Sequence, residues 1–211
     1  MGYISRKEWA LLICLFVFSF VPVVGGALRI VEIAGGPAIA PNNLRINADP
    51  LPALLHLLGA IPFCILGAFQ FLPSIRKHAP KWHRCNGWIV IQGGIVSSIT
   101  GLWMTQVYDL PVELQGGFLY FVRMVMGTAM TFFILLGLAA IRKRRVDVHS
   151  SWMIRAYAIG QGASTQTLIG LTWMAVMKEE PAGFPRDVMM TLAWVVNLMV
   201  AEWIIRKPSK N

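Results

Sequence analysis

The chain is 211 residues long, and 56% of its residues are apolar whereas only 14% are charged. Apolar runs of about 18 or more residues are typical of transmembrane helices, so the composition indicates an integral membrane protein without a separate soluble enzyme domain. The formal net charge is +9, but the Lys and Arg residues cluster at the ends of apolar stretches, where they face anionic lipid head groups. This arrangement excludes a soluble basic face for nucleic acid.

The first predicted helix covers residues 10–28 and follows the basic residues Arg6 and Lys7. A basic start before an apolar run also fits a secretory signal peptide, but this run is long for one, so we expect an uncleaved helix. Residues 29–52 contain repeated Pro, Gly and Asn residues, which interrupt helices. We therefore predict an outer loop over 29–52.

Five further apolar stretches complete the predicted architecture, and they cover residues 53–72, 86–104, 117–141, 152–177 and 188–205. None of them shows the interruptions that mark substrate sites in transporters. Cytoplasmic loops carry an excess of Lys and Arg, and six spans place most of these residues on one side, leaving on the other Arg29, Arg45, Arg123, Lys178 and Arg186. We therefore predict a single all-α domain over residues 1–211, an integral membrane bundle of six transmembrane helices with both termini cytoplasmic.

A duplicated tract marks the predicted cytoplasmic side. Residues 75–83 read IRKHAPKWH and residues 141–149 read IRKRRVDVH, so Ile-Arg-Lys, five residues and a His occur twice at the same spacing. Each tract lies between two apolar stretches, which indicates an apolar hairpin that is used more than once. His83 and His149 then stand at similar depth, each just before a helix that starts at the inner surface.

Two imidazoles on different helices at one depth suit a cofactor. His83 and His149 can hold a b-type haem axially, or two sides of a metal with a third ligand such as His78. Arg84 and Arg155 can pair with haem propionates, because a guanidinium matches a carboxylate. The alternative is that these interfacial residues only hold the turn and contact lipid phosphate, and the spacing alone favours it. The duplication strengthens the cofactor interpretation without deciding between the two.

His56 is a separate candidate, because it lies about one turn inside an apolar helix, where an ionisable residue is costly. Arg123 lies at a comparable outer depth on the fourth predicted helix. The two can form a structural hydrogen bond or a site for a substrate or quinone head group, and the sequence favours neither. A dihaem cytochrome needs two histidines at this outer level, and only one is present.

Other intramembrane polar residues, including Gln161, Gln166 and Asn197, are interpreted as hydrogen-bonding groups between helices. The chain has no Gly-rich phosphate loop, no nucleophile elbow and no H-E-x-x-H zinc motif, so the sequence assigns no catalytic residue and no reaction.

Several tracts together resemble a known family. They are Leu55-His56, the run from Gly67 to Pro73 followed by Arg76, His83-Arg84-x-x-Gly87, and His149-x-x-Trp152-Met153-x-Arg155-x-Tyr157-Ala158. Over residues 52–163 the chain resembles bacterial multi-pass membrane proteins of unknown function, domain of unknown function twenty-three-oh-six. Ser150 departs from that pattern, which usually has Arg after the second His, and Gln166 and Thr167 stand where a further Arg is expected. The resemblance implies a bacterial inner-membrane location and a matched His83–His149 pair, and it implies no reaction.

Three functional hypotheses remain. The first is a redox protein of the lipid bilayer that binds haem or metal through His83 and His149 and handles a quinone near His56 and Arg123. The second is a non-catalytic or assembly subunit of a larger membrane complex, suggested by short loops and the absence of a soluble part. The third and weakest is a small transporter that uses His56 and Arg123.

Overall fold

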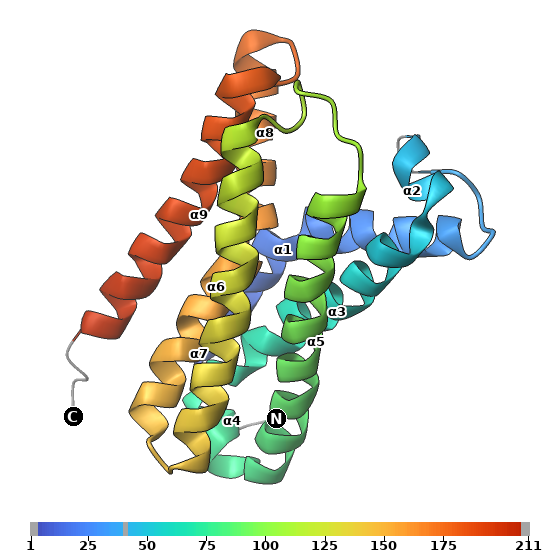
Figure 1. The fold of residues 1–211 in the computed structure, drawn as a ribbon. Coiled ribbons are helices and arrows are strands. Elements are labelled where there is room, and N and C mark those ends of the chain that lie inside the picture. The colour runs from blue at the N-terminus through green and yellow to red at the C-terminus, as the bar shows by residue number, and fades with distance from the viewer. Residues whose placement is uncertain (1–3, 40–41, 208–211) are drawn as a thin grey trace. The chain divides into compact units, whose positions relative to one another are not determined.

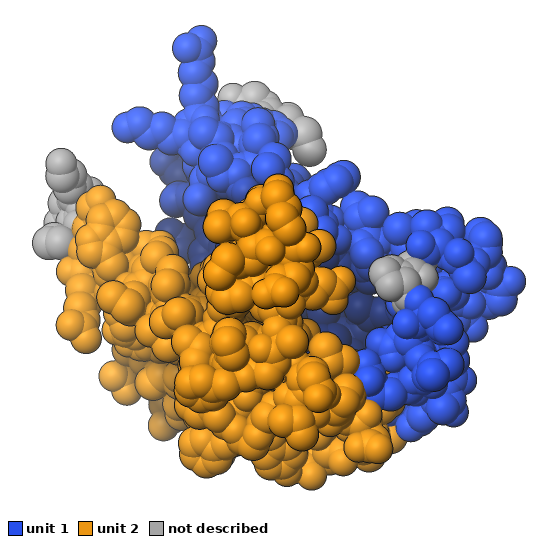
Figure 2. All heavy atoms as spheres, turned by 90° about the horizontal axis from the view of Figure 1, so that it is seen from above, with its two compact units in different colours: residues 1–101 blue, residues 102–211 orange. Residues whose placement is uncertain are grey.

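The computed structural model describes residues 4–39 and 42–207, and the regular elements of these residues are all α-helices (Figure 1). The chain divides into two compact units, which Figure 2 distinguishes by colour: unit 1 comprises residues 1–101 and unit 2 comprises residues 102–211. The boundary falls within helix α5 (Pro80–Val107). The prediction of a single transmembrane domain stays a prediction.

Unit 1 is built on α1 (Arg6–Ile33), α3 (Pro50–Gln70) and most of α5, with two short helices, α2 (Leu44–Ala48) and α4 (Pro73–His78). Proline begins α3, α4 and α5, where its fixed φ suits the first helical turn and its missing N–H costs nothing. The predicted outer loop over 29–52 is therefore wrong in part. The first helix continues to Ile33, and α2 and the start of α3 also lie in that stretch.

The basic tract 75–83 is helical on both sides of Ala79, where α4 ends just before Pro80. A carboxylate fixes this region to the first helix. Glu8 completes a capping box with Ser5 at the start of α1, and it also accepts hydrogen bonds from the backbone N and the Oγ of Ser74, at 2.8 and 2.6 Å. One residue thus caps α1 and holds the first turn of α4 against it.

Helices α3 and α5 cross closely within unit 1, and the crossing point consists of glycine. A Cβ placed on Gly59 would lie 2.6 Å from the carbonyl oxygen of Gly93, and a Cβ on Gly93 would lie 2.7 Å from the carbonyl oxygen of Gly59. Small residues of this kind let two membrane helices approach backbone to backbone. The glycine contact therefore fixes the separation of α3 and α5.

Unit 2 contains the end of α5, α6 (Gly117–Arg142), α7 (Val146–Gly160), α8 (Gly162–Met177) and α9 (Gly183–Arg206). Helices α6 and α7 form a tight hairpin, in which Arg144 adopts a left-handed backbone with φ of 57°. Helix α9 packs against α6, α7 and α8. The unit is therefore organised around its last helix.

The fifth predicted helix, 152–177, is interrupted at Gln161 and corresponds to most of α7 followed by α8. Helix α9 closes the break, because Asn197 Nδ2 donates to the Ala158 carbonyl at 3.0 Å and Trp194 Nε1 donates to the Ile159 carbonyl at 3.2 Å. These side chains replace helix bonds that the interruption removes. The expectation of uninterrupted helices is thus wrong here, and the break is a stabilised kink.

Five described helices are long and apolar enough to cross a membrane: α1, α3, α5, α6 and α9. Each carries exposed large apolar side chains, such as Val17 on α1, Phe132 on α6 and Met199 on α9, as lipid contact requires. Helices α7 and α8 have only 15 and 16 residues. The count of six spans and the cytoplasmic location of both termini stay predictions, and residues 1–3 and 208–211 lie outside the described part of the chain.

Candidate functional site

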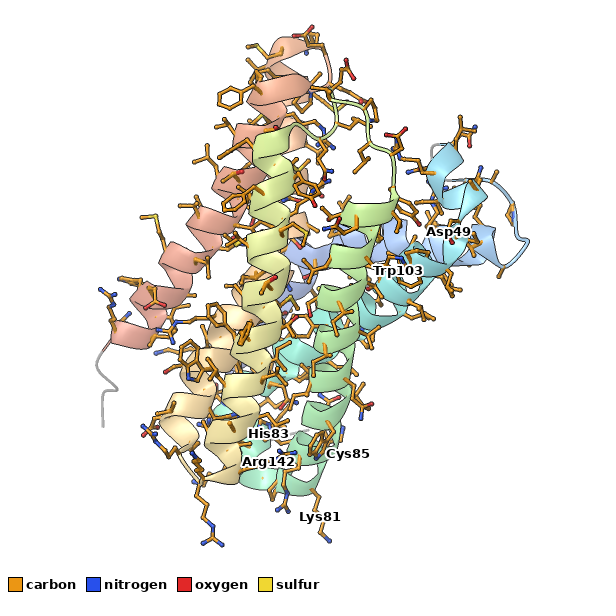
Figure 3. All side chains as sticks on the ribbon, viewed as in Figure 1. Asp49, Lys81, His83, Cys85, Trp103 and Arg142 are labelled. Carbon is orange, nitrogen blue, oxygen red and sulfur yellow. The ribbon has the colours of Figure 1, made fainter. Side chains whose placement is uncertain are left out.

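The first histidine of the duplicated tract, His83, lies on the first turn of α5, and Figure 3 labels it with Lys81 and Cys85 from the same helix end. His83 is half-buried, whereas Arg84 is exposed. The start of α5 is anchored to α3 in unit 1, because Asn86 Nδ2 donates to the Leu66 carbonyl at 3.1 Å. His83 is therefore held on a fixed helix end.

The second histidine, His149, lies on the first turn of α7 and contacts α6. Its Nδ1 lies 2.9 Å from the carbonyl oxygen of Gly137. A carbonyl only accepts hydrogen bonds, so Nδ1 carries the proton, and in the neutral ring Nε2 keeps its lone pair. A Cβ on Gly137 would lie 3.0 Å from Met153 Sδ and 3.5 Å from Trp152 Cβ, so α6 and α7 approach each other closely here. Close packing of α6 and α7 thus fixes the tautomer of His149.

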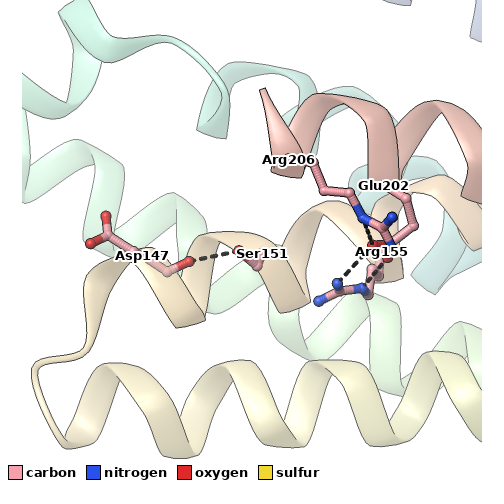
Figure 4. A network of polar contacts seen from close by, with 5 residues as sticks. All are labelled: Asp147, Ser151, Arg155, Glu202 and Arg206. Atoms are coloured by element: carbon pink, nitrogen blue, oxygen red, sulfur yellow. Dashed lines mark hydrogen bonds and ion pairs between the residues drawn. The ribbon is translucent and has the colours of Figure 1, made fainter. Parts of the chain in front are cut away.

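Arg155 is paired within the chain. Its Nε and Nη2 donate to the two carboxylate oxygens of Glu202 at 2.5 and 3.1 Å, which joins α7 to α9 (Figure 4). The guanidinium also lies 4.8 Å from the ring centroid of Trp152, and Arg206 approaches the same carboxylate at 3.7 Å. The Arg155 guanidinium, which the sequence suggests as a partner of a haem propionate, thus already forms a bidentate ion pair. Its pairing with a propionate stays a prediction.

His56 is bonded inside unit 1 in the same manner as His149. Its Nδ1 lies 2.9 Å from the Ser97 carbonyl on α5, and the Thr100 hydroxyl lies 3.5 Å from the same nitrogen. Nδ1 therefore holds the proton in this ring as well. The contact lies about one helical turn from the Gly59–Gly93 crossing, so helix separation and ring orientation are linked.

Arg123 lies at the opposite end of α6 from residues 141–149, beside two charged residues that are not among the predicted site residues, Arg186 and Asp187. Its Nη1 donates to Gln115 Oε1, while Arg186 Nη1 donates to the Leu114 carbonyl at 3.2 Å. Asp187 is only 2% exposed and accepts a hydrogen bond from the Gly116 backbone N at 3.3 Å. The sequence signal for these two residues is that an Arg and an Asp are adjacent just before the last predicted apolar stretch.

The profile of a family described as "Predicted membrane protein (DUF2306)" matches residues 53–205, which is most of the chain. The chain belongs to this family. The resemblance over residues 52–163 is thereby confirmed, and the match extends it through α9. No curated protein and no solved structure matches the chain.

In this DUF2306 protein the candidate residues fall into both units. His83, Arg84 and His56 belong to unit 1, whereas His149, Arg155 and Arg123 belong to unit 2. The pairing of His83 with His149, and of His56 with Arg123, stays a prediction. Within residues 4–39 and 42–207, no three His, Cys, Asp or Glu residues are grouped as a metal site requires. The description of the DUF2306 family names no reaction.

Proposed function

We propose that this membrane protein binds a redox cofactor, a b-type haem or a metal ion, with His149 as one ligand. The observation that carries the proposal is the hydrogen bond from His149 Nδ1 to the Gly137 carbonyl, at 2.9 Å. Ligating histidines commonly donate their other ring N–H to a backbone carbonyl or a carboxylate, which fixes the tautomer and orients the ring. Nε2 of His149 is then the nitrogen that binds.

The second ligand in this proposal is His83, which the duplicated tract predicts on sequence grounds. His83 lies on the first turn of α5 and His149 on the first turn of α7, so helical structure holds the backbone of each histidine in place. Arg84 is exposed and keeps a guanidinium for a propionate, whereas Arg155 serves to hold Glu202. His56, with its Nδ1 on Ser97, is the proposed quinone-side residue, because its Nε2 can accept a hydrogen bond from a quinol.

The test is the absorption spectrum and metal content of the full chain extracted in mild detergent. We expect a Soret band or stoichiometric metal in the wild-type protein, and loss of either in His149→Asn. Asn is the informative replacement, because its amide can still donate to the Gly137 carbonyl while it removes the Nε2 ligand. Circular dichroism checks that the variant remains helical.

The matched control is His78→Asn. His78 is exposed on α4, and its Nδ1 contacts the Ser74 carbonyl of its own helix at 3.0 Å. A haem held by His83 and His149 should survive this change, whereas a three-ligand metal that includes His78 should be lost. A wild-type preparation with neither Soret band nor metal contradicts the proposal. Co-purification with a defined partner then tests the subunit hypothesis.

A further inference from the structure

We infer that unit 2 carries a binding site for a phosphate oxyanion, formed by the guanidinium groups of Arg123 and Arg186. This site is separate from the histidines of the proposed redox function, and no part of the inference depends on them. It lies at the end of the unit where α6 and α9 both begin, which Figure 1 shows within unit 2. The charge pattern predicts that this end faces the outside.

The two guanidinium groups reach the same short segment. Arg123 extends from α6 to the side chain of Gln115, and Arg186 extends from the first turn of α9 to the carbonyl of Leu114. The backbone N of Gly183 also donates to the Glu113 carbonyl at 2.8 Å, which ties the start of α9 to this segment. Neighbouring residues of one segment thus hold both cations at one place.

Both cations are bonded only to neutral oxygen atoms. The ion pairs Arg29–Glu32, Arg155–Glu202 and Arg206–Glu202 of the described residues include neither Arg123 nor Arg186. Both side chains are half-buried, so water compensates their charges incompletely. Each guanidinium has five N–H donors, and its hydrogen bond to the 114–115 segment uses one of them.

The nearest carboxylate, Asp187, interacts electrostatically with both arginines and offsets part of their positive charge. Asp187 is buried and its Oδ1 accepts from the Gly116 N–H at the start of α6, a helix end that has no other side-chain cap. An anion in this position offsets the positive end of the helix dipole. Glu180 lies within electrostatic range of Arg186 but is exposed and forms no ion pair with it in the described structure. Two guanidinium groups thus share one buried carboxylate, whose single negative charge offsets at most one of their two positive charges.

The surroundings point to an anion with several oxygens at a membrane interface. Paired guanidinium groups bind phosphate in a bidentate manner, which satisfies their remaining donors. The exposed rings of Phe118 and Phe184 contact each other at the same helix ends, with centroids 6.0 Å apart. Aromatic side chains of this kind gather at the level of lipid head groups. The phosphate comes from a phospholipid head group or from a soluble phosphate, and the two sources share this chemistry.

The experiment measures thermal stabilisation of the full chain in a neutral glycoside detergent during titration with short-chain phosphatidylglycerol or with inorganic phosphate. We expect a saturable rise in melting temperature, and an apparent affinity about tenfold weaker in Arg123→Gln and in Arg186→Gln, since each loses charged hydrogen bonds to the anion. Arg186→Lys, which keeps the charge and loses the planar donors, should also weaken binding. Arg142→Gln, an exposed arginine at the far end of α6, is the matched control.

The outcomes separate the two sources. Arginine-dependent stabilisation by the lipid alone assigns a head group, and arginine-dependent stabilisation by inorganic phosphate assigns a soluble ligand. Titration curves of Arg123→Gln and Arg186→Lys that coincide with those of the wild-type chain and of Arg142→Gln overturn the inference. Absence of stabilisation by both probes in the wild-type chain overturns it as well. Neither result bears on the Soret band or the metal content, so the redox proposal is tested independently.

Discussion

Replacing Gly59 by Ala tests the glycine crossing that holds α3 and α5 together. The new methyl group would lie 2.6 Å from the Gly93 carbonyl oxygen and 2.9 Å from the Ser97 backbone N, whereas an ordinary contact begins at 3.4 Å. The first contact is short by the difference, 0.8 Å. Both neighbours are backbone atoms within a helix, so no flexible side chain can move aside. The helices themselves must separate.

The expected cost follows from this separation. Overpacking of a close contact destabilises a protein by about 1–3 kcal/mol, and we expect the upper part of that range because the obstruction is backbone. The His56 Nδ1 to Ser97 carbonyl distance, now 2.9 Å, would lengthen to about 3.7 Å if the helices move apart by the same amount, which is beyond a hydrogen bond. The preference for a protonated Nδ1 in His56 should therefore be lost.

The assay is thermal unfolding of the detergent-extracted chain, with ¹⁵N NMR of labelled histidine to follow the Nδ1 proton. Gly25→Ala is the control, because a Cβ at that position of α1 meets nothing within 4 Å. Removing a glycine from a helix interior there should stabilise the chain by about 0.5–1 kcal/mol. If Gly59→Ala has the same melting temperature as Gly25→Ala and leaves the His56 signal unchanged, the glycine crossing does not control the stability of unit 1 and the reasoning is refuted.

Two further predictions concern the contacts of α9. Gly162→Ala should destabilise unit 2 by about 1–3 kcal/mol, because its Cβ would overlap the indole of Trp194 that closes the helix break; a melting temperature equal to the wild-type value would contradict this. Glu202→Gln should cost about 1.5–3 kcal/mol in unfolding free energy, since it removes the charged partner of Arg155, whereas Arg206→Gln should cost less than about 1 kcal/mol because that side chain is 80% exposed. Equal losses in the two variants would contradict the assignment.

The sequence predicts the apolar helices well because lipid imposes a simple rule on them. A membrane span must bond its own backbone, so an apolar run of sufficient length is helical whatever its neighbours are. The stretches predicted at 53–72, 117–141 and 188–205 correspond closely to α3, α6 and α9. The capping box at Ser5 and the prolines at 50, 73 and 80 set helix starts by local chemistry.

The interruption at Gln161 shows where that rule ends. Residues 160–162, Gly-Gln-Gly, lie inside a continuous apolar stretch, and nothing local requires the helix to stop there. The break is stable because the side chains of Trp194 and Asn197, more than thirty positions away, donate hydrogen bonds to the helix carbonyls beside it. Hydrogen bonds between the side chains of distant segments depend on how the helices pack. No local residue spacing in the sequence predicts that packing.

The candidate sites divide in the same way. The sequence by itself determined an all-helical membrane protein, its family, and the duplicated tract with His83 and His149, because length, apolarity and repetition are properties of the chain. Only the tertiary structure decided that Arg155 is paired with Glu202, that Asp187 is committed to the start of α6, and that Arg123 and Arg186 meet at one segment. The physical reason is that the role of a charged side chain depends on the group with which it pairs. When that group lies on another helix, the packing of the helices determines which group it is.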